Sequence, residues 1–135
     1  MKLRDFILLP ALLPASVLAS TVVYTDSQHL PENLSPDVVV VLLDEPERLQ
    51  AKVFGQLPAD PELAAMQARQ VMSSPQWQQK QQQLVTAYRQ VVHARELGIR
   101  KVPAVVFDDR DVVYGTTDVA QAQALRLQVE SVKVV

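Results

Sequence analysis

Two kinds of hydrophobic pattern alternate along this chain, short runs of β-branched residues and longer segments with apolar residues every three or four positions. Residues 21–25 (Thr-Val-Val-Tyr-Thr) and residues 38–43 (Val-Val-Val-Val-Leu-Leu) are runs of the first kind, and both predict strands. A continuous apolar run is typical of a strand covered on both faces, so residues 38–43 predict a parallel, central strand. The proline-containing segment between the two runs predicts a loop.

Residues 44–98 carry the second pattern, which predicts three helices. Each predicted helix has a proline in its first turn, where the missing N–H costs nothing, at Pro46, Pro61 and Pro75. Gly98 is a typical stop for the last and longest of these helices. The apolar residues that we expect to dock this helix on the sheet are Trp77, Leu84, Tyr88, Val91 and Val92.

The last part of the chain predicts a hairpin and a helix. Residues 102–107 and 111–115 are apolar runs separated by a short polar turn at residues 108–110, and Asp118 is a capping residue for a final helix. The predicted order is β-β-α-α-α-β-β-α. This order indicates an α/β fold with a central mixed four-stranded sheet and a helical insertion.

The first 19 residues have the layout of a secretory signal. Lys2 and Arg4 precede an apolar run that ends in small residues at Ala19. The run is shorter than a bilayer-spanning helix and contains two prolines, and no later stretch is long and apolar enough to span a membrane. We therefore expect cleavage after Ala19 and a periplasmic mature chain, residues 20–135, that forms one domain.

Composition excludes several classes of activity. The 135 residues include no cysteine, so the chain has no disulfide, no thiolate nucleophile and no thiol redox chemistry. The 13 basic and 15 acidic residues are mixed along the chain without a basic cluster. Direct binding of nucleic acid is therefore not expected, because no surface would track a phosphate backbone.

The loop at residues 26–29 (Asp-Ser-Gln-His) contains the residue types of a hydrolase triad. A triad needs a defined hydrogen-bond order and an oxyanion hole, which side chains within four positions of one another rarely provide. The two histidines of the chain, His29 and His93, lack metal-ligand spacing, so no metal or other cofactor is predicted. A structural account is sufficient for Asp26 and Ser27, whose side chains readily bond to nearby backbone amides and close turns.

A first strand ending at residues 24–26, a helical insertion, and a proline directly before an apolar strand resemble a thioredoxin-like domain of the periplasmic disulfide-isomerase type. In that family a cis proline, at the position of Pro103, lies beside the active-site loop, and a Cys-x-x-Cys motif follows the first strand. Here residues 26–29 stand in place of that motif. The resemblance therefore implies the thioredoxin-like scaffold with a cis Pro103 and without redox activity.

The chain is also similar to a family of small exported proteins encoded on integrating conjugative elements. The segments that carry this similarity are residues 22–29, 44–49, 57–61 and 113–119. Membership implies a role in conjugative DNA transfer, in assembling the mating-pair or type IV secretion apparatus.

We therefore expect a protein without catalytic residues that binds protein partners of the conjugative transfer machinery. A periplasmic chaperone-like holdase on the same redox-inactive scaffold is the alternative, and an enzyme that uses Ser27 and His29 is a third hypothesis. Oligomeric state and the identity of the partner stay open at this point, as does the choice between the proline loop and the helical insertion at residues 46–98 as the contact region. The expected contact surface consists of Tyr24, Asp26, Ser27, His29, Val102 and Pro103.

Overall fold

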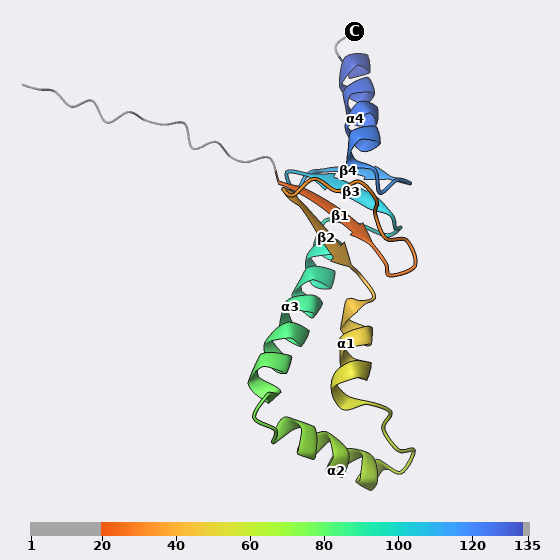
Figure 1. Cartoon of the computed structure of the whole chain (residues 1–135). Helices are drawn as coiled ribbons and strands as arrows, with labels where there is room; N and C mark the ends of the chain where they lie inside the picture. The colour runs from red at the N-terminus through yellow and green to blue at the C-terminus, as the bar shows by residue number, and fades with distance from the viewer. Residues whose placement is uncertain (1–19, 134–135) are drawn as a thin grey trace, which may run out of the picture.

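The computed structural model describes residues 20–133 and contains a four-stranded sheet and four helices (Figure 1). The predicted signal segment, residues 1–19, lies outside the described residues. The elements in chain order are β1 (Thr21–Thr25), β2 (Val38–Leu42), α1 (Glu45–Phe54), α2 (Pro61–Met72), α3 (Trp77–Glu96), β3 (Ala104–Phe107), β4 (Asp111–Tyr114) and α4 (Val119–Lys133).

The sheet is mixed, as predicted, and its strand order is β2-β1-β3-β4. β1 pairs in parallel with β2 and antiparallel with β3, and β3 pairs antiparallel with β4. The pairing places Tyr24 opposite Ala104 and Thr21 opposite Phe107. The two central strands, β1 and β3, thus come from opposite halves of the sequence.

β2 is parallel to its neighbour, as predicted, but it is an edge strand and not a central one. Val39 in its middle is 53% exposed, so the strand is not covered on both faces. The run of five apolar residues from Val38 to Leu42 led to the wrong position because hydrophobicity reports burial on average and does not identify the neighbouring strands.

Each face of the sheet buries its own apolar cluster. The C-terminal end of α3 covers one face and the first turn of α4 covers the other (Figure 1). The alternation of side chains along β1 and β3 distributes their residues between these two faces. The buried residues are Tyr24, Val41, Ala94, Ile99, Ala104 and Val106 on the α3 face, and Val23, Val105, Phe107 and Ala122 on the α4 face.

α1, α2 and α3 form an arm that extends away from the sheet (Figure 1). α1 and α3 run side by side, α2 closes the tip, and the rings of Phe54 and Trp77 are 5.7 Å apart between centroids. The prediction that the whole apolar stripe of α3 docks on the sheet is wrong, because Tyr88 and Val92 are exposed. A 20-residue helix is about 30 Å long and exceeds the length of these strands, so only its last turns reach them.

The β3–β4 hairpin has the predicted polar turn. Asp108 and Asp109 both have positive φ, 56° and 52°, and the N–H of Arg110 donates to the carbonyl of Phe107 at 3.1 Å. Two positive-φ residues with this bond are the signature of a type I′ turn, whose twist matches that of the strands.

We expect that Val105→Ala lowers the free energy of unfolding by about 2–3 kcal/mol, because it removes two buried methyl groups and leaves a cavity in the central strand. Val105 is fully buried, whereas Val39, in edge strand β2, is half exposed. Val39→Ala is the matched control, with an expected change within about 0.5 kcal/mol. Urea denaturation measures both values, and equal losses would contradict this assignment of the core.

Candidate functional site

The end of β1 and the start of β3 lie side by side at one end of the sheet. Their ladder stops at the pair Tyr24 and Ala104, so the loop of residues 26–29 begins two positions beyond it and Pro103 stands one position before it. The Val102–Pro103 peptide bond is cis, as the resemblance implied. The structure thus brings together two segments that are more than seventy residues apart in the sequence.

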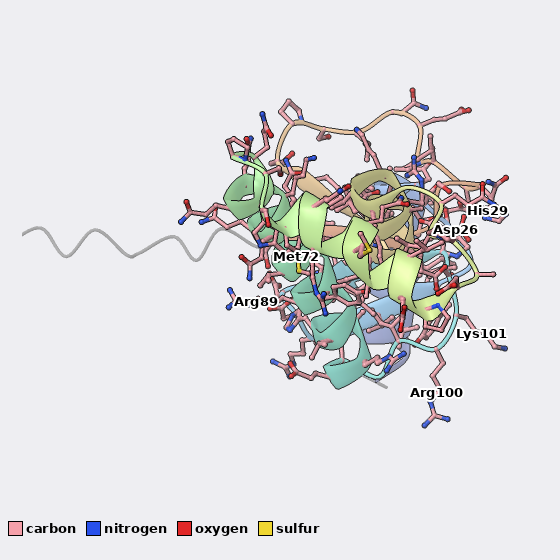
Figure 2. All side chains as sticks on the ribbon, turned by 90° about the horizontal axis from the view of Figure 1, so that it is seen from below. Asp26, His29, Met72, Arg89, Arg100 and Lys101 are labelled. Atoms are coloured by element: carbon pink, nitrogen blue, oxygen red, sulfur yellow. The ribbon has the colours of Figure 1, made fainter. Side chains whose placement is uncertain are left out.

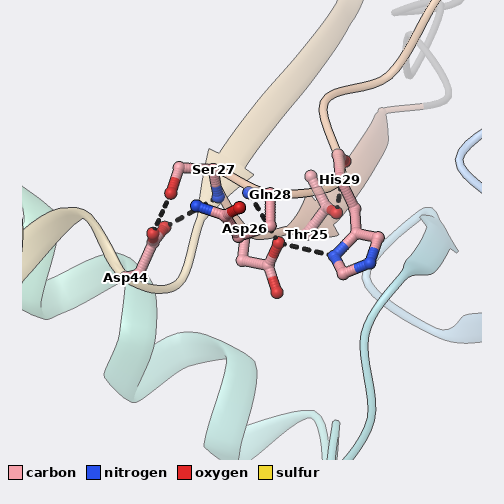
Figure 3. A network of polar contacts seen from close by, with 6 residues as sticks. All are labelled: Thr25, Asp26, Ser27, Gln28, His29 and Asp44. Carbon is pink, nitrogen blue, oxygen red and sulfur yellow. Dashed lines mark hydrogen bonds and ion pairs between the residues drawn. The ribbon is translucent and has the colours of Figure 1, made fainter.

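Asp26 organises the loop that follows β1 (Figure 3). Its carboxylate accepts the backbone N–H of Gln28 at 3.0 Å and contacts Nδ1 of His29 at 2.7 Å, and its carbonyl accepts the N–H of His29 at 3.2 Å. The Thr25 hydroxyl donates to the carbonyl of His29 at 2.7 Å. One aspartate therefore closes the turn, which is the structural role that the sequence indicated for it.

Asp44 anchors this loop to the start of α1 (Figure 3). Its Oδ1 accepts the backbone N–H of Ser27 at 3.1 Å and its Oδ2 accepts the Ser27 hydroxyl. Asp44 occupies the N-cap position of α1, yet its side chain makes no capping bond there. β1 and β2 are parallel, so their C-terminal ends lie side by side, and the residues after β2 can reach the loop after β1.

Electrostatics favour the charged form of Asp26. The hydrogen bond from His29, together with the backbone N–H groups of Gln28 and His29, lowers the pKa of the Asp26 carboxyl below its ordinary value. The carboxylate is therefore ionised at neutral pH and stays available as the acceptor that closes the turn.

The loop does not have the geometry of a hydrolase triad. Such a triad requires the serine hydroxyl to donate to the histidine, and the histidine to be oriented by the aspartate. Here His29 does contact Asp26, but the Ser27 hydroxyl donates to Asp44. Ser27 and His29 are thus hydrogen-bonded to two different carboxylates and not to each other.

Tyr24 belongs to the core and not to the surface of the site. It is 2% exposed and packs with residues of β2, β3 and α3. Burial, with the nearby charge of Asp109 as a second cause, raises the pKa of its phenol above the ordinary value. The expectation that Tyr24 contributes to a contact surface is wrong, because in the alternation along β1 its side chain points toward the face that α3 covers.

The other predicted residues reach the surface to different degrees. His29 is the most open, with 63% of its side chain exposed, and Asp26, Ser27, Val102 and Pro103 are half-buried. The structure therefore brings these five together at one end of the sheet, as a surface and not as a closed pocket.

Arg100 and Lys101 were not predicted from the sequence as residues of this surface. Both are exposed, precede β3, and extend from the side of the molecule that also carries Asp26 and His29 (Figure 2). Their position directly before a predicted strand was the available signal, but two basic residues form no motif by themselves. They add positive charge to this side of the molecule.

A second polar cluster, at the opposite end of β3, was not predicted either. Nε2 of His93 lies 3.2 Å from Asp109 in the hairpin turn, and Nδ1 lies 3.5 Å from Glu96. The hydrogen bond to Asp109, helped by Glu96, raises the pKa of the His93 imidazole. His93 therefore ties α3 to the β3–β4 turn when it is protonated.

The fold and this site define a cysteine-free mixed α/β protein with a polar, hydrogen-bonded loop at one end of its sheet. Residues 18–130 match the family described as "Protein of unknown function (DUF1525)", and the chain belongs to that family. Neither the curated proteins nor the solved structures contain a match. Within residues 20–133, no three histidine, aspartate or glutamate side chains form a group that could hold a metal ion. The helices of that same part are all too short or too polar to cross a membrane.

We expect that Ser27→Ala lowers the free energy of unfolding by about 1–2 kcal/mol, because it removes a half-buried hydrogen bond to a carboxylate. Ser35→Ala, in the exposed part of the same connection between β1 and β2, is the matched control and should change stability little. Chemical denaturation provides the comparison, and a neutral Ser27→Ala would show that Asp44 does not anchor the loop through this hydroxyl.

We expect the His93 ion pair to make stability depend on pH. Because the folded-state pKa of His93 is raised, its contribution is fully present below the unfolded-state pKa and is lost as pH rises through the folded-state pKa. The melting temperature of the wild type should therefore exceed that of His93→Ala by more at about pH 5.5 than at about pH 8.5. Asp109→Asn should remove most of the same pH dependence. A difference in melting temperature that is equal at both pH values would count against the pair.

Proposed function

We propose that this protein is a non-catalytic binding or assembly module, exported to the periplasm, that contacts protein components of a conjugative transfer (type IV secretion) apparatus. Its scaffold is thioredoxin-like and redox-inactive. Support for the conjugative role comes from the similarity, in four segments, to small exported proteins of integrating conjugative elements. Support for export comes from the signal layout of residues 1–19.

The sheet supports the thioredoxin-like assignment. A parallel β1–β2 pair, an antiparallel β3–β4 hairpin added at β1, and a proline before β3 beside the loop after β1 agree with that class. One feature departs from the usual pattern, since parallel strands are commonly joined through a helix and residues 26–37 contain none. The loop after β1 is therefore open to solvent at this end of the sheet.

The observation that carries the proposal is the convergence of a hydrogen-bonded polar loop with Pro103 at an open surface. Asp26 and Asp44 hold the loop through several hydrogen bonds, while the imidazole of His29 stays largely exposed. A surface that is already ordered loses little conformational freedom when a partner binds. In a chain without cysteine, such a surface supports recognition and not thiol exchange.

A chaperone-like holdase is the second candidate, and the helical arm favours it. α2 has no buried residue, and several large apolar side chains of the arm are exposed. Flexible methionine-containing surfaces suit loose binding of varied apolar partners. The exposed apolar residues of α2 and α3 are Leu63, Met66, Met72, Val85, Tyr88 and Val92.

Crosslinking and pull-down of the protein from donor cells during mating tests the proposed function. We expect His29→Ala to reduce recovery of a stoichiometric partner severalfold while thermal unfolding changes little. His93→Ala is the matched control, because it removes the other histidine, at the opposite end of β3, and should leave recovery unchanged. Equal recovery with both variants would contradict a contact surface at the loop.

Two further measurements separate the alternatives. Suppression of aggregation of unrelated denatured proteins, abolished in the double variant Met66→Ser and Met72→Ser, would support the holdase and count against the binding module.

Covalent labelling of Ser27 by a serine-directed reagent would support an enzyme. We expect no labelling, because the hydroxyl donates to Asp44 and no histidine accepts its proton.

A further inference from the structure

β4 is an edge strand whose outer side is unpaired in the described part of the chain. It pairs with β3 and with no other strand of the sheet. Natural edge strands are protected against the addition of another strand by proline, by charged side chains, by short length or by a covering helix or loop. β4, Asp-Val-Val-Tyr, is short but has no proline or lysine, and the charge of its Asp111 is paired with Arg126 of α4. Its outer backbone groups can therefore accept a further strand.

The register identifies those outer groups. The N–H of Gly115 donates to the carbonyl of Pro103 at 3.0 Å, so Gly115 directs its backbone toward β3. Backbone direction alternates along an antiparallel strand, so Val113 also faces β3, and Val112 and Tyr114 direct their N–H and C=O groups outward. Val112 and Tyr114, which are separated by one residue, therefore offer the backbone groups that one more antiparallel strand needs for a short ladder.

A groove of about 680 Å³ runs beside this edge, beneath the projecting part of α4, and its lining combines apolar residues with Arg110, Asp111 and Arg126. Leu125 and Val129 of α4 line it with 40% and 58% of their surface exposed, and Val113 lines it from the strand. The first half of α4 contacts the sheet through Val119, Ala122 and Arg126, and the rest of the helix stands away from it (Figure 1). A helix of this length is marginal without packing along its apolar side.

We propose that a second copy of this chain occupies this edge, with the two β4 strands paired antiparallel about a two-fold axis. The axis passes beside Val113, which then faces Val113 of the partner subunit as a non-hydrogen-bonded pair. Val112 forms its backbone bonds with the partner's Tyr114, and Tyr114 with the partner's Val112. The two four-stranded sheets become one continuous sheet.

Self-complementarity favours a second copy over a strand from another protein. A two-fold interface requires one surface to be complementary to itself. Val112 and Tyr114 meet this requirement, because each lies directly opposite the other residue of the second copy. The register sets Asp111 opposite the partner's Gly115, so no like charges oppose each other across the new ladder. Both α4 helices then stand on the same face of the joined sheet, and Leu125 and Val129 of both copies cover the seam.

Sedimentation of the protein purified after expression of the full-length chain tests the association. We expect a concentration-dependent dimer whose dissociation constant rises roughly tenfold or more with Leu125→Glu, because a charge replaces an apolar side chain that would be buried at the seam. Leu127→Glu is the matched control, since Leu127 is similarly exposed on the same helix but does not line the groove. A monomer at all concentrations, or equal effects of the two variants, would overturn the proposal.

Disulfide crosslinking tests the register, because the chain has no cysteine of its own. In a non-hydrogen-bonded pair the two Cα atoms are about 4.5 Å apart, within the range that a disulfide spans. Val113→Cys should therefore yield a covalent dimer on mild oxidation. Val112→Cys should not, because Val112 and the partner's Val112 are offset by two residues. Crosslinking of neither variant, or of both at the same rate, would rule out this pairing.

Discussion

The antiparallel pairing of β1 with β3 is the interaction on which the rest of this structure depends. It joins the first strand of the described chain to a strand more than seventy residues later, across the whole helical arm. The core of both faces and the juxtaposition of the Asp26 loop with Pro103 follow from this one ladder. A contact of such long sequence separation has a large loop-closure entropy cost, which is offset by the fully buried residues of the two strands.

Hydrogen bonds order the polar loop that follows β1. Asp26 and Asp44 are acceptors for backbone and side-chain donors of one short segment. The lowered pKa of Asp26 is consistent with that structural role. Order of this kind, with His29 left exposed, is what a recognition surface needs, whereas catalysis would need the Ser27 hydroxyl directed to His29.

The two ends of the sheet and its edge offer separate surfaces. The loop and Pro103 occupy one end, the His93–Asp109 pair closes the other, and β4 with α4 forms the open edge. A protein that associates through β4 would display two copies of the loop at the same time, and paired sites bind a multivalent assembly more strongly than either site alone. The proposed association therefore fits an assembly role without depending on it.

Local pattern alone determined most elements of this chain. β-branched runs marked the strands, and Pro46 and Pro61 marked the starts of α1 and α2. Asp60 and Asp118 cap α2 and α4 through backbone N–H groups of the first turn. α3 is the exception, because it begins at Trp77 and so leaves Pro75 outside its first turn. These features are local because the backbone requirements of a strand or a helix end are met within a few residues. The lack of cysteine likewise excludes thiol redox chemistry whatever the fold, because that chemistry needs a sulfur atom that the chain does not contain.

The tertiary structure alone decided which residues meet. It put β2 at the edge, Tyr24 in the core, Asp44 on Ser27 and His93 on Asp109, because each outcome depends on strand order and register and not on the residue's own neighbours in sequence. Hydrophobicity indicates that a residue prefers burial, but it does not specify against what. That choice is made by the pairing of distant strands, which no local pattern in a single sequence encodes.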